Sequence, residues 1–125
     1  MRFEVKVGNE TIGYTELEAG DPSMGVAGGR FLPTAAYLSI QPHCIKHRDN
    51  WVAIPELSVS TPTGVRLEFS GPIQILDFSP ELGTTDIQIE VCGIIKPPYA
   101  ELFPHHVEAY KKQFGWSSRT RRLPR

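Results

Sequence analysis

The feature that most constrains the fold is a strict alternation of apolar and polar residues over residues 86–91. Ile87, Ile89 and Val91 alternate there with charged or amide side chains. Successive side chains of a β-strand point to opposite faces, so this pattern predicts a strand with one buried and one solvated face. Such strands are typical of antiparallel sheets, because parallel sheets are usually covered on both faces.

Two regions of the chain combine this alternation with turn residues and therefore predict β-hairpins. Residues 2–17 contain two alternating runs separated by Gly8-Asn9, residue types that tolerate a positive φ. Residues 57–69 contain two further runs separated by Thr61-Pro62-Thr63-Gly64, which suits a short loop. Another strand is expected to begin at Ile73.

The segment between the two hairpins, residues 18–55, is rich in proline and glycine and has no clear period. We interpret Met24 to Leu32 and Ala35 to Ile40 as two short strands, and Cys44 to Val52 as a loop or a single helical turn. Farther along the chain, Pro80 to Gly83 is expected to form a loop. These short elements have the weakest local signals in the sequence.

The glycine-rich segment Gly-Val-Ala-Gly-Gly-Arg at residues 25–30 resembles a phosphate-binding loop only in its glycine content. It lacks the Gly-Lys-Ser/Thr ending and the following helix on which such loops depend. We favour a β-bulge or a tight strand crossing at which only glycine fits.

A single helix is predicted over about residues 104–114. Pro104 suits the first turn of a helix, where a missing N–H is harmless, and Gly115 suits the residue after its end. Apolar residues at spacings of four, three and four form a stripe that would face a sheet: Phe103, Val107, Tyr110 and Phe114. The expected class is therefore α+β, with a mainly antiparallel sheet, sandwich-like or a partly open barrel, and one C-terminal helix packed on it.

The length of 125 residues corresponds to about one domain. We assign residues 1–115 to a single β-rich domain and residues 116–125 to a basic tail. No apolar run approaches the ~20 residues that a membrane span needs. The first residues alternate charge and hydrophobe and do not resemble a secretory signal, so we expect a cytoplasmic protein with two free cysteines and no membrane contact.

The charge of the chain is divided unevenly along its length. Residues 1–110 contain all 14 acidic residues and seven basic ones, a formal charge of −7, whereas residues 111–125 contain six basic residues and no acidic one. An acidic body with a basic extension can neutralise itself or bind a partner of complementary charge. A pI of about 6.4 argues against nucleic acid as the partner of the body.

Cysteine and histidine side chains provide the only candidates for metal or nucleophile chemistry. His43, Cys44 and His47 are zinc-ligand types, but their spacing is not that of a known zinc site, and a fourth ligand would have to come from Cys92 or from His105-His106. The same side chains could form a Cys-His nucleophile. The alternative is a pair of loop histidines beside a buried cysteine, with His105-His106 at the surface or at the core edge.

The tail contains the strongest interaction signal in the sequence. Trp116 is followed by four arginines, which combine a large apolar anchor with forked donors suited to carboxylates or phosphates. We therefore assign partner binding to Trp116, Arg119, Arg121 and Arg122. The alternative is a solvated end that folds back on the acidic face of the body.

Three classes of function remain, and we favour a non-enzymatic protein-binding module. One concrete version is an inhibitor or immunity-type protein that blocks a basic partner with the Asp and Glu side chains of its acidic body. A small metal- or thiol-dependent enzyme using His43, Cys44 and His47 is one alternative. A structural or assembly subunit that self-associates through a basic arm is the other. We expect a protein partner and no cofactor, and no residue is assigned a catalytic role.

Overall fold

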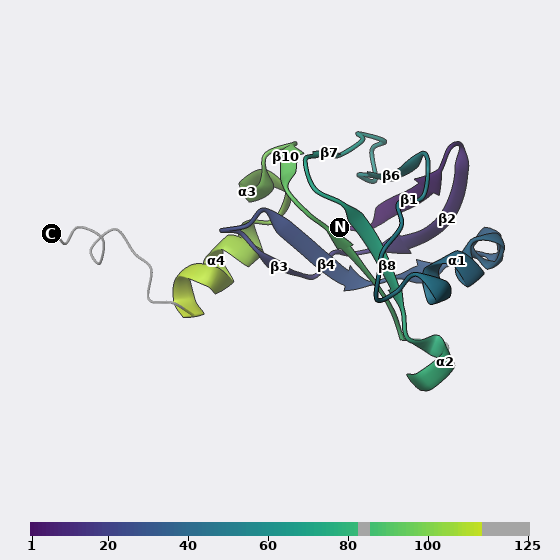
Figure 1. Ribbon diagram of the computed structural model, residues 1–125. Helices are drawn as coiled ribbons and strands as arrows, with labels where there is room; N and C mark the ends of the chain where they lie inside the picture. The colour runs from purple at the N-terminus through teal and green to yellow at the C-terminus, as the bar shows by residue number, and fades with distance from the viewer. Residues whose placement is uncertain (83–85, 114–125) are drawn as a thin grey trace, which may run out of the picture.

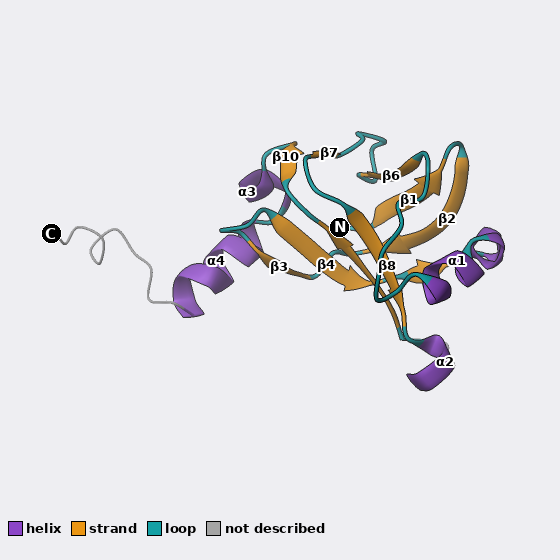
Figure 2. Cartoon of the chain, in the orientation of Figure 1, coloured by secondary structure: helices purple, strands orange, loops and turns teal. Residues whose placement is uncertain are grey.

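Two four-stranded antiparallel sheets and one two-stranded sheet form the body of the protein (Figures 1 and 2). The computed structural model describes residues 1–82 and 86–113. Sheet A has the order β5-β2-β1-β6, with β1 (Phe3–Val7), β2 (Glu10–Thr15), β5 (Leu32–Pro33) and β6 (Leu57–Ser60). Sheet B has the order β3-β4-β9-β8, with β3 (Ala19–Asp21), β4 (Val26–Arg30), β8 (Ile73–Asp77) and β9 (Ile87–Val91). The third sheet pairs β7 (Glu68–Phe69) with β10 (Ile94–Lys96).

Five short helical segments accompany the sheets. They are the 3-10 helix η1 (Ala35–Ser39) and the α-helices α1 (Gln41–Lys46), α2 (Ser79–Leu82), α3 (Tyr99–Leu102) and α4 (Pro104–Gln113). The predicted α+β class with antiparallel sheets is confirmed, and in the described residues the sheets do not close into a barrel. None of these helices is long and apolar enough to cross a membrane.

The period-two patterns of residues 2–17 and 86–91 form the strands that they predict. The hairpin predicted over residues 57–69 is reduced to one isolated antiparallel bridge between Ser60 and Arg66, while β6 pairs with β1 and β7 pairs with β10 in a different sheet. Ile87, Ile89 and Val91 of β9 are buried, while Gln88 between them is exposed. The hairpin expected over residues 2–17 is β1 and β2. Side chains from the inner faces of both large sheets belong to one hydrophobic core, which includes Phe3, Val5, Ile12, Val59, Ile75, Ile89 and Val91. Burial of this shared core is the main stabilising contribution to the fold.

Sheets A and B meet at Phe31, the single residue between β4 and β5. Phe31 is 1% exposed, and its backbone N–H donates to the carbonyl oxygen of Ile87 in β9 at 2.8 Å. Its ring lies against Gly13 of β2 so closely that a Cβ on Gly13 would overlap it. The chain therefore passes from one sheet to the other through one buried aromatic residue.

The short elements of residues 33–82 differ from the prediction. Ala35 to Ile40 was predicted to be a strand, but a 3-10 helix forms over Ala35–Ser39, and the expected loop at Pro80 to Gly83 begins as helix α2. Helix α1 starts before the expected turn, with Pro42 in its first turn. Tertiary contacts explain these differences, because η1 and α1 are held against the end of β8 by a buried hydrogen-bond network.

That network centres on Asp77, which is completely buried at the end of β8. Its carboxylate accepts hydrogen bonds from the Tyr37 hydroxyl at 2.7 Å, from Gln41 Nε2 at 3.0 Å, and from the backbone N–H of Ser79 at 2.8 Å. Burial alone would raise the pKa of Asp77, but hydrogen bonds from Ser79, Tyr37 and Gln41 outweigh it and lower that pKa below its ordinary value. Asp77 thus joins η1, α1 and α2 to sheet B.

Replacement of Asp77 by alanine should lower the free energy of unfolding by about 3 kcal/mol, because it leaves buried donors of Tyr37 and Ser79 without an acceptor. Tyr37→Phe should cost about 1 kcal/mol, since only one hydrogen bond is lost. Urea denaturation measures both values. Asp49, whose side chain is 93% exposed, provides the control: Asp49→Ala should change the stability by less than about 0.5 kcal/mol. Equal effects of the Asp77 and Asp49 changes would contradict the structural role of Asp77.

Helix α4 forms where the sequence predicts it, up to Gln113; the expected continuation at Phe114 and the cap at Gly115 lie outside the described residues. The helix packs beside the edge strand β3 (Figure 1). The residue that α4 buries is His106, at 4% exposed, and Val107 of the predicted stripe is only half-buried. Phe103 of the stripe is buried and Tyr110 is half-buried, so the stripe faces the body, and His106 lies on the same side of the helix.

His106 is hydrogen-bonded to Tyr99, with its Nδ1 atom 2.9 Å from the Tyr99 hydroxyl oxygen. The Tyr99 hydroxyl also lies 2.8 Å from the carbonyl oxygen of Val26, to which it can donate. Nε2 of His106 is buried. Burial, followed by the proximity of His105, lowers the pKa of His106 below its ordinary value.

Stability should fall on mild acidification because of His106. The unfolded chain protonates this histidine as the pH drops through about 6.5, whereas the folded chain binds the proton only at lower pH. The free energy of unfolding should decrease over this window, with a slope of at most about 1.4 kcal/mol per pH unit for one proton, and level off below the folded pKa. His106→Gln should reduce this pH dependence, measured by urea denaturation between pH 5 and 8. An unchanged pH profile in the His106→Gln variant would contradict the assignment.

Candidate functional site

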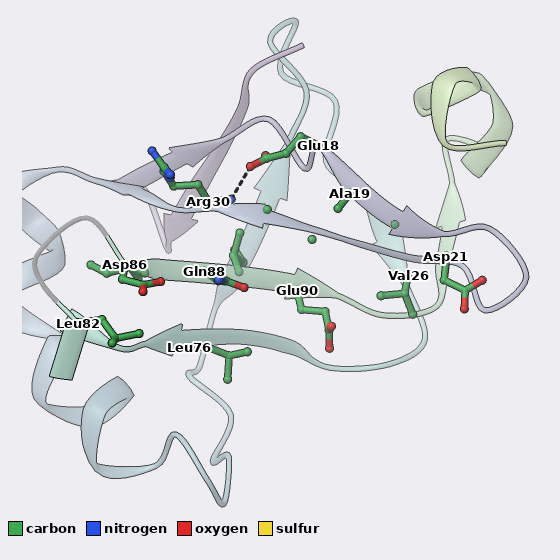
Figure 3. A pocket seen from close by; sticks show the side chains of 15 residues that line it. Glu18, Ala19, Asp21, Val26, Arg30, Leu76, Leu82, Asp86, Gln88 and Glu90 are labelled. Atoms are coloured by element: carbon green, nitrogen blue, oxygen red, sulfur yellow. Dashed lines mark hydrogen bonds between the residues drawn. The ribbon is translucent and has the colours of Figure 1, made fainter. Parts of the chain in front are cut away.

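A groove of about 620 Å³ lies over sheet B (Figure 3). Residues of β3, β4 and β9 form most of its lining, and Leu76 of β8 and Leu82 of α2 contribute apolar side chains. We call it the acidic groove, because four carboxylates line it: Glu18, Asp21, Asp86 and Glu90. Arg30 is the one basic residue in the described lining, so negative charge predominates by four to one.

Strand pairing brings these side chains together from two distant parts of the chain. β4 pairs antiparallel with β9, so that Gly28 lies opposite Glu90 and Arg30 lies opposite Gln88. Gly28 and Gly29 carry no side chain, so the backbone of β4 lines the groove at these positions. The glycine-rich segment at residues 25–30 is thus a β-strand on the groove lining rather than a loop.

Glu18 reaches the groove because the chain reverses sharply just before it. Leu17 has φ 46°, a left-handed conformation that costs about 1 kcal/mol for a residue with a Cβ. Its side chain is fully buried, and its N–H donates to Thr15 Oγ1 at 3.1 Å, which offsets that cost. The Glu18 carboxylate then lies over Gly29, where a Cβ would overlap it, and accepts a hydrogen bond from the N–H of Arg30 at 2.9 Å (Figure 3).

The carboxylates of the acidic groove have no ion-pair partner within residues 1–82 and 86–113. Asp21 accepts from Ser23 at 2.6 Å and Glu90 accepts a weak hydrogen bond from Cys92 at 3.7 Å, so neither meets a cation. By contrast, Glu81 of α2 is paired with Arg48 at 2.7 Å. The groove carboxylates therefore retain the capacity to bind arginine or lysine side chains from outside the described residues.

The structure separates the three residues of the predicted metal site. Cys44 is fully buried on α1, whereas His43 and His47 are only half-buried, with their ring centroids 4.7 Å apart. His43 Nε2 donates to the carbonyl oxygen of Val52 at 2.7 Å, which leaves only Nδ1 for a metal. Across residues 1–82 and 86–113 no three His, Cys, Asp or Glu side chains are grouped so as to hold a metal ion. Zinc binding by these residues would require Cys44 to leave the core.

Neither cysteine has the environment of a nucleophile. Burial raises the pKa of the Cys44 thiol to about 11. Burial and the adjacent Glu90 carboxylate also raise the pKa of Cys92. A cysteine nucleophile requires the opposite shift, since the thiolate is the reactive form.

The residues predicted to bind a partner through the tail, Trp116, Arg119, Arg121 and Arg122, lie outside the described residues, so that assignment stays a prediction. The sequence did not predict which residues form the acidic groove. Its carboxylates lie up to about 70 residues apart in sequence, and the only signal for them was the general acidity of residues 1–110.

Comparison of the chain with protein-family models, with curated proteins and with solved structures finds no match. The function must therefore be inferred from the chemistry of the groove itself.

The two thiols should react slowly in the folded protein. At pH 7.5 a thiol of pKa about 11 is ionised in fewer than about one molecule in a thousand, against about one in ten for an ordinary thiol. With Ellman's reagent, Cys44 should react only on unfolding and Cys92 more slowly than a model thiol. A Cys92→Ser variant isolates the reaction of Cys44. A rapid reaction of one thiol in the native protein would instead favour the thiol-enzyme alternative.

Proposed function

We propose that the protein is a non-enzymatic protein-binding module of the inhibitor or immunity type, and that its acidic groove receives a basic segment of the partner. The observation that carries this proposal is the absence of ion-pair partners, within the described residues, for the four carboxylates that line the groove. Such carboxylates can bind a cationic surface without breaking an existing ion pair.

Electrostatics gives such a groove two effects on a basic partner. Concentrated negative charge raises the rate of association, and the bound body then covers the cationic surface and denies it to other ligands. The groove also offers an apolar contact, since Leu82 at its end is 69% exposed. An apolar anchor surrounded by charged groups is a common arrangement at protein interfaces.

The two alternatives receive less support from the described residues. A metal- or thiol-dependent enzyme would use Cys44, whose thiol is buried with a raised pKa. An assembly subunit would depend on residues 116–125, which lie outside the described part of the chain. Each of these functions has its own readout, metal content or thiol reactivity for the first and self-association for the second.

Neutralising the groove should remove partner binding. The variant Asp86→Asn/Glu90→Gln keeps the size of both side chains and removes two of the four carboxylates of the groove. Loss of these contacts should weaken the complex about tenfold or more and slow its association. The measurement is capture of a stoichiometric basic protein from native lysate, followed by binding kinetics with that purified protein at 50 and 500 mM salt.

A matched control separates the groove from net charge. Glu10→Gln/Glu68→Gln removes the same charge from exposed positions on β2 and β7 outside the groove, and should bind as the unmodified protein does. Equal weakening in both variants, or association independent of salt, would count against the groove as the binding site. Inhibition of the partner's own activity by the unmodified protein is expected from the blocking mechanism.

A further inference from the structure

A second hollow lies beside helix α4 and shares part of its lining with the acidic groove. It has a volume of about 400 Å³ and lies between β3 and α4, with Gln113 and Ala109 on the helix side. On the sheet side it is lined by residues 18–21, which also line the acidic groove. Gln113 is the last residue of α4 and of the described chain, and it lines this second hollow, which borders the groove at residues 18–21.

The segment that follows Gln113 is positively charged, whereas the groove is mainly negatively charged. Residues 114–125 contain four arginines and no acidic residue. The groove presents four carboxylates that have no ion-pair partner among the described residues. Guanidinium groups bind carboxylates through paired hydrogen bonds, so the two surfaces are complementary in chemistry as well as in charge.

The segment is also long enough to reach across the groove. Arg119 follows Gln113 by six residue steps, and an extended chain of that length spans roughly 20 Å. The four strands of sheet B cover three inter-strand spacings, about 14 Å in total. A segment of this length is therefore enough to cross the width of sheet B.

We propose that residues 116–125 of the same chain occupy the acidic groove when no partner is bound, and that a basic partner must displace them. The second part of this proposal, displacement by a basic partner, rests on the proposed function. A tethered segment has an effective concentration on the order of 1 mM. A tail with an intrinsic dissociation constant of about 0.1 mM would thus fill the groove about nine-tenths of the time, and would weaken the apparent affinity of a competing partner about tenfold.

Paramagnetic relaxation in the full-length chain tests the contact directly. A nitroxide is attached at Ser118→Cys in a Cys92→Ser background, where the remaining Cys44 is buried. The amide signals of Gly28, Gly29 and Glu90 should lose more than half of their intensity at low salt. They should recover in 1 M salt, where the screening length is about 3 Å, and in the Asp86→Asn/Glu90→Gln variant. The Glu10→Gln/Glu68→Gln variant should retain the broadening, and an absence of broadening at low salt would overturn the proposal.

A mixing experiment distinguishes the chain's own tail from that of a second copy. Isotope-labelled protein without nitroxide is combined with unlabelled protein that carries it. Unchanged groove signals are expected. Broadening of the same amides in the mixture would show that the tail reaches a neighbouring molecule, and would overturn the intramolecular contact.

Partner affinity separates failure of this inference from failure of the proposed function. Arg119→Gln/Arg121→Gln/Arg122→Gln should bind the basic partner several-fold to tenfold more tightly, because the competitor is weakened. If that affinity stays unchanged while neutralising the groove still weakens binding, the tail does not compete and this inference fails alone. If the amide signals of the groove are broadened but no basic partner is captured, the tail contact is supported and the proposed function fails.

Discussion

The placement of Phe31 between two strands of different sheets is the constraint on which the rest of the structure depends. Its ring fills the corner against Gly13 of sheet A, while its N–H is bonded to Ile87 of sheet B. A shift of β4 relative to β9 would therefore expose an aromatic ring and break a backbone hydrogen bond at the same time. The position of the Phe31 side chain therefore fixes the register in which Gly28 lies opposite Glu90. The lining of the groove depends on this register.

The acidic residues of the chain serve two different purposes. Asp77 is buried and accepts hydrogen bonds from three neighbouring residues, so its charge is fully used in joining helices to sheet B. Glu18 and Asp21 are exposed at the groove, and each accepts hydrogen bonds from a single residue. A charge that is satisfied internally contributes to stability, whereas a charge left open to solvent contributes to recognition. This difference, more than the total number of acidic residues, distinguishes the groove from the remainder of the surface.

Sequence patterns predicted the elements whose period extends over several residues. β1, β2 and β9 alternate clearly because one face of each is buried, and α4 starts at a favourable proline. Short segments such as η1 were not predictable, since their conformation is set by Tyr37 reaching Asp77, about 40 residues away in sequence. The groove was not predictable residue by residue for the same reason: Glu18 and Glu90 line one groove only because β4 pairs with β9. The burial of His106 likewise involves Tyr99, which the apolar stripe does not include.

The pairing of β4 with β9 also determines when the groove can exist during synthesis. Ala27 of β4 pairs with Val91 of β9, so this pairing cannot form until β9 has been synthesised. Contacts between residues so distant in sequence also form slowly. The two halves of the groove are thus apart until most of the chain has been translated.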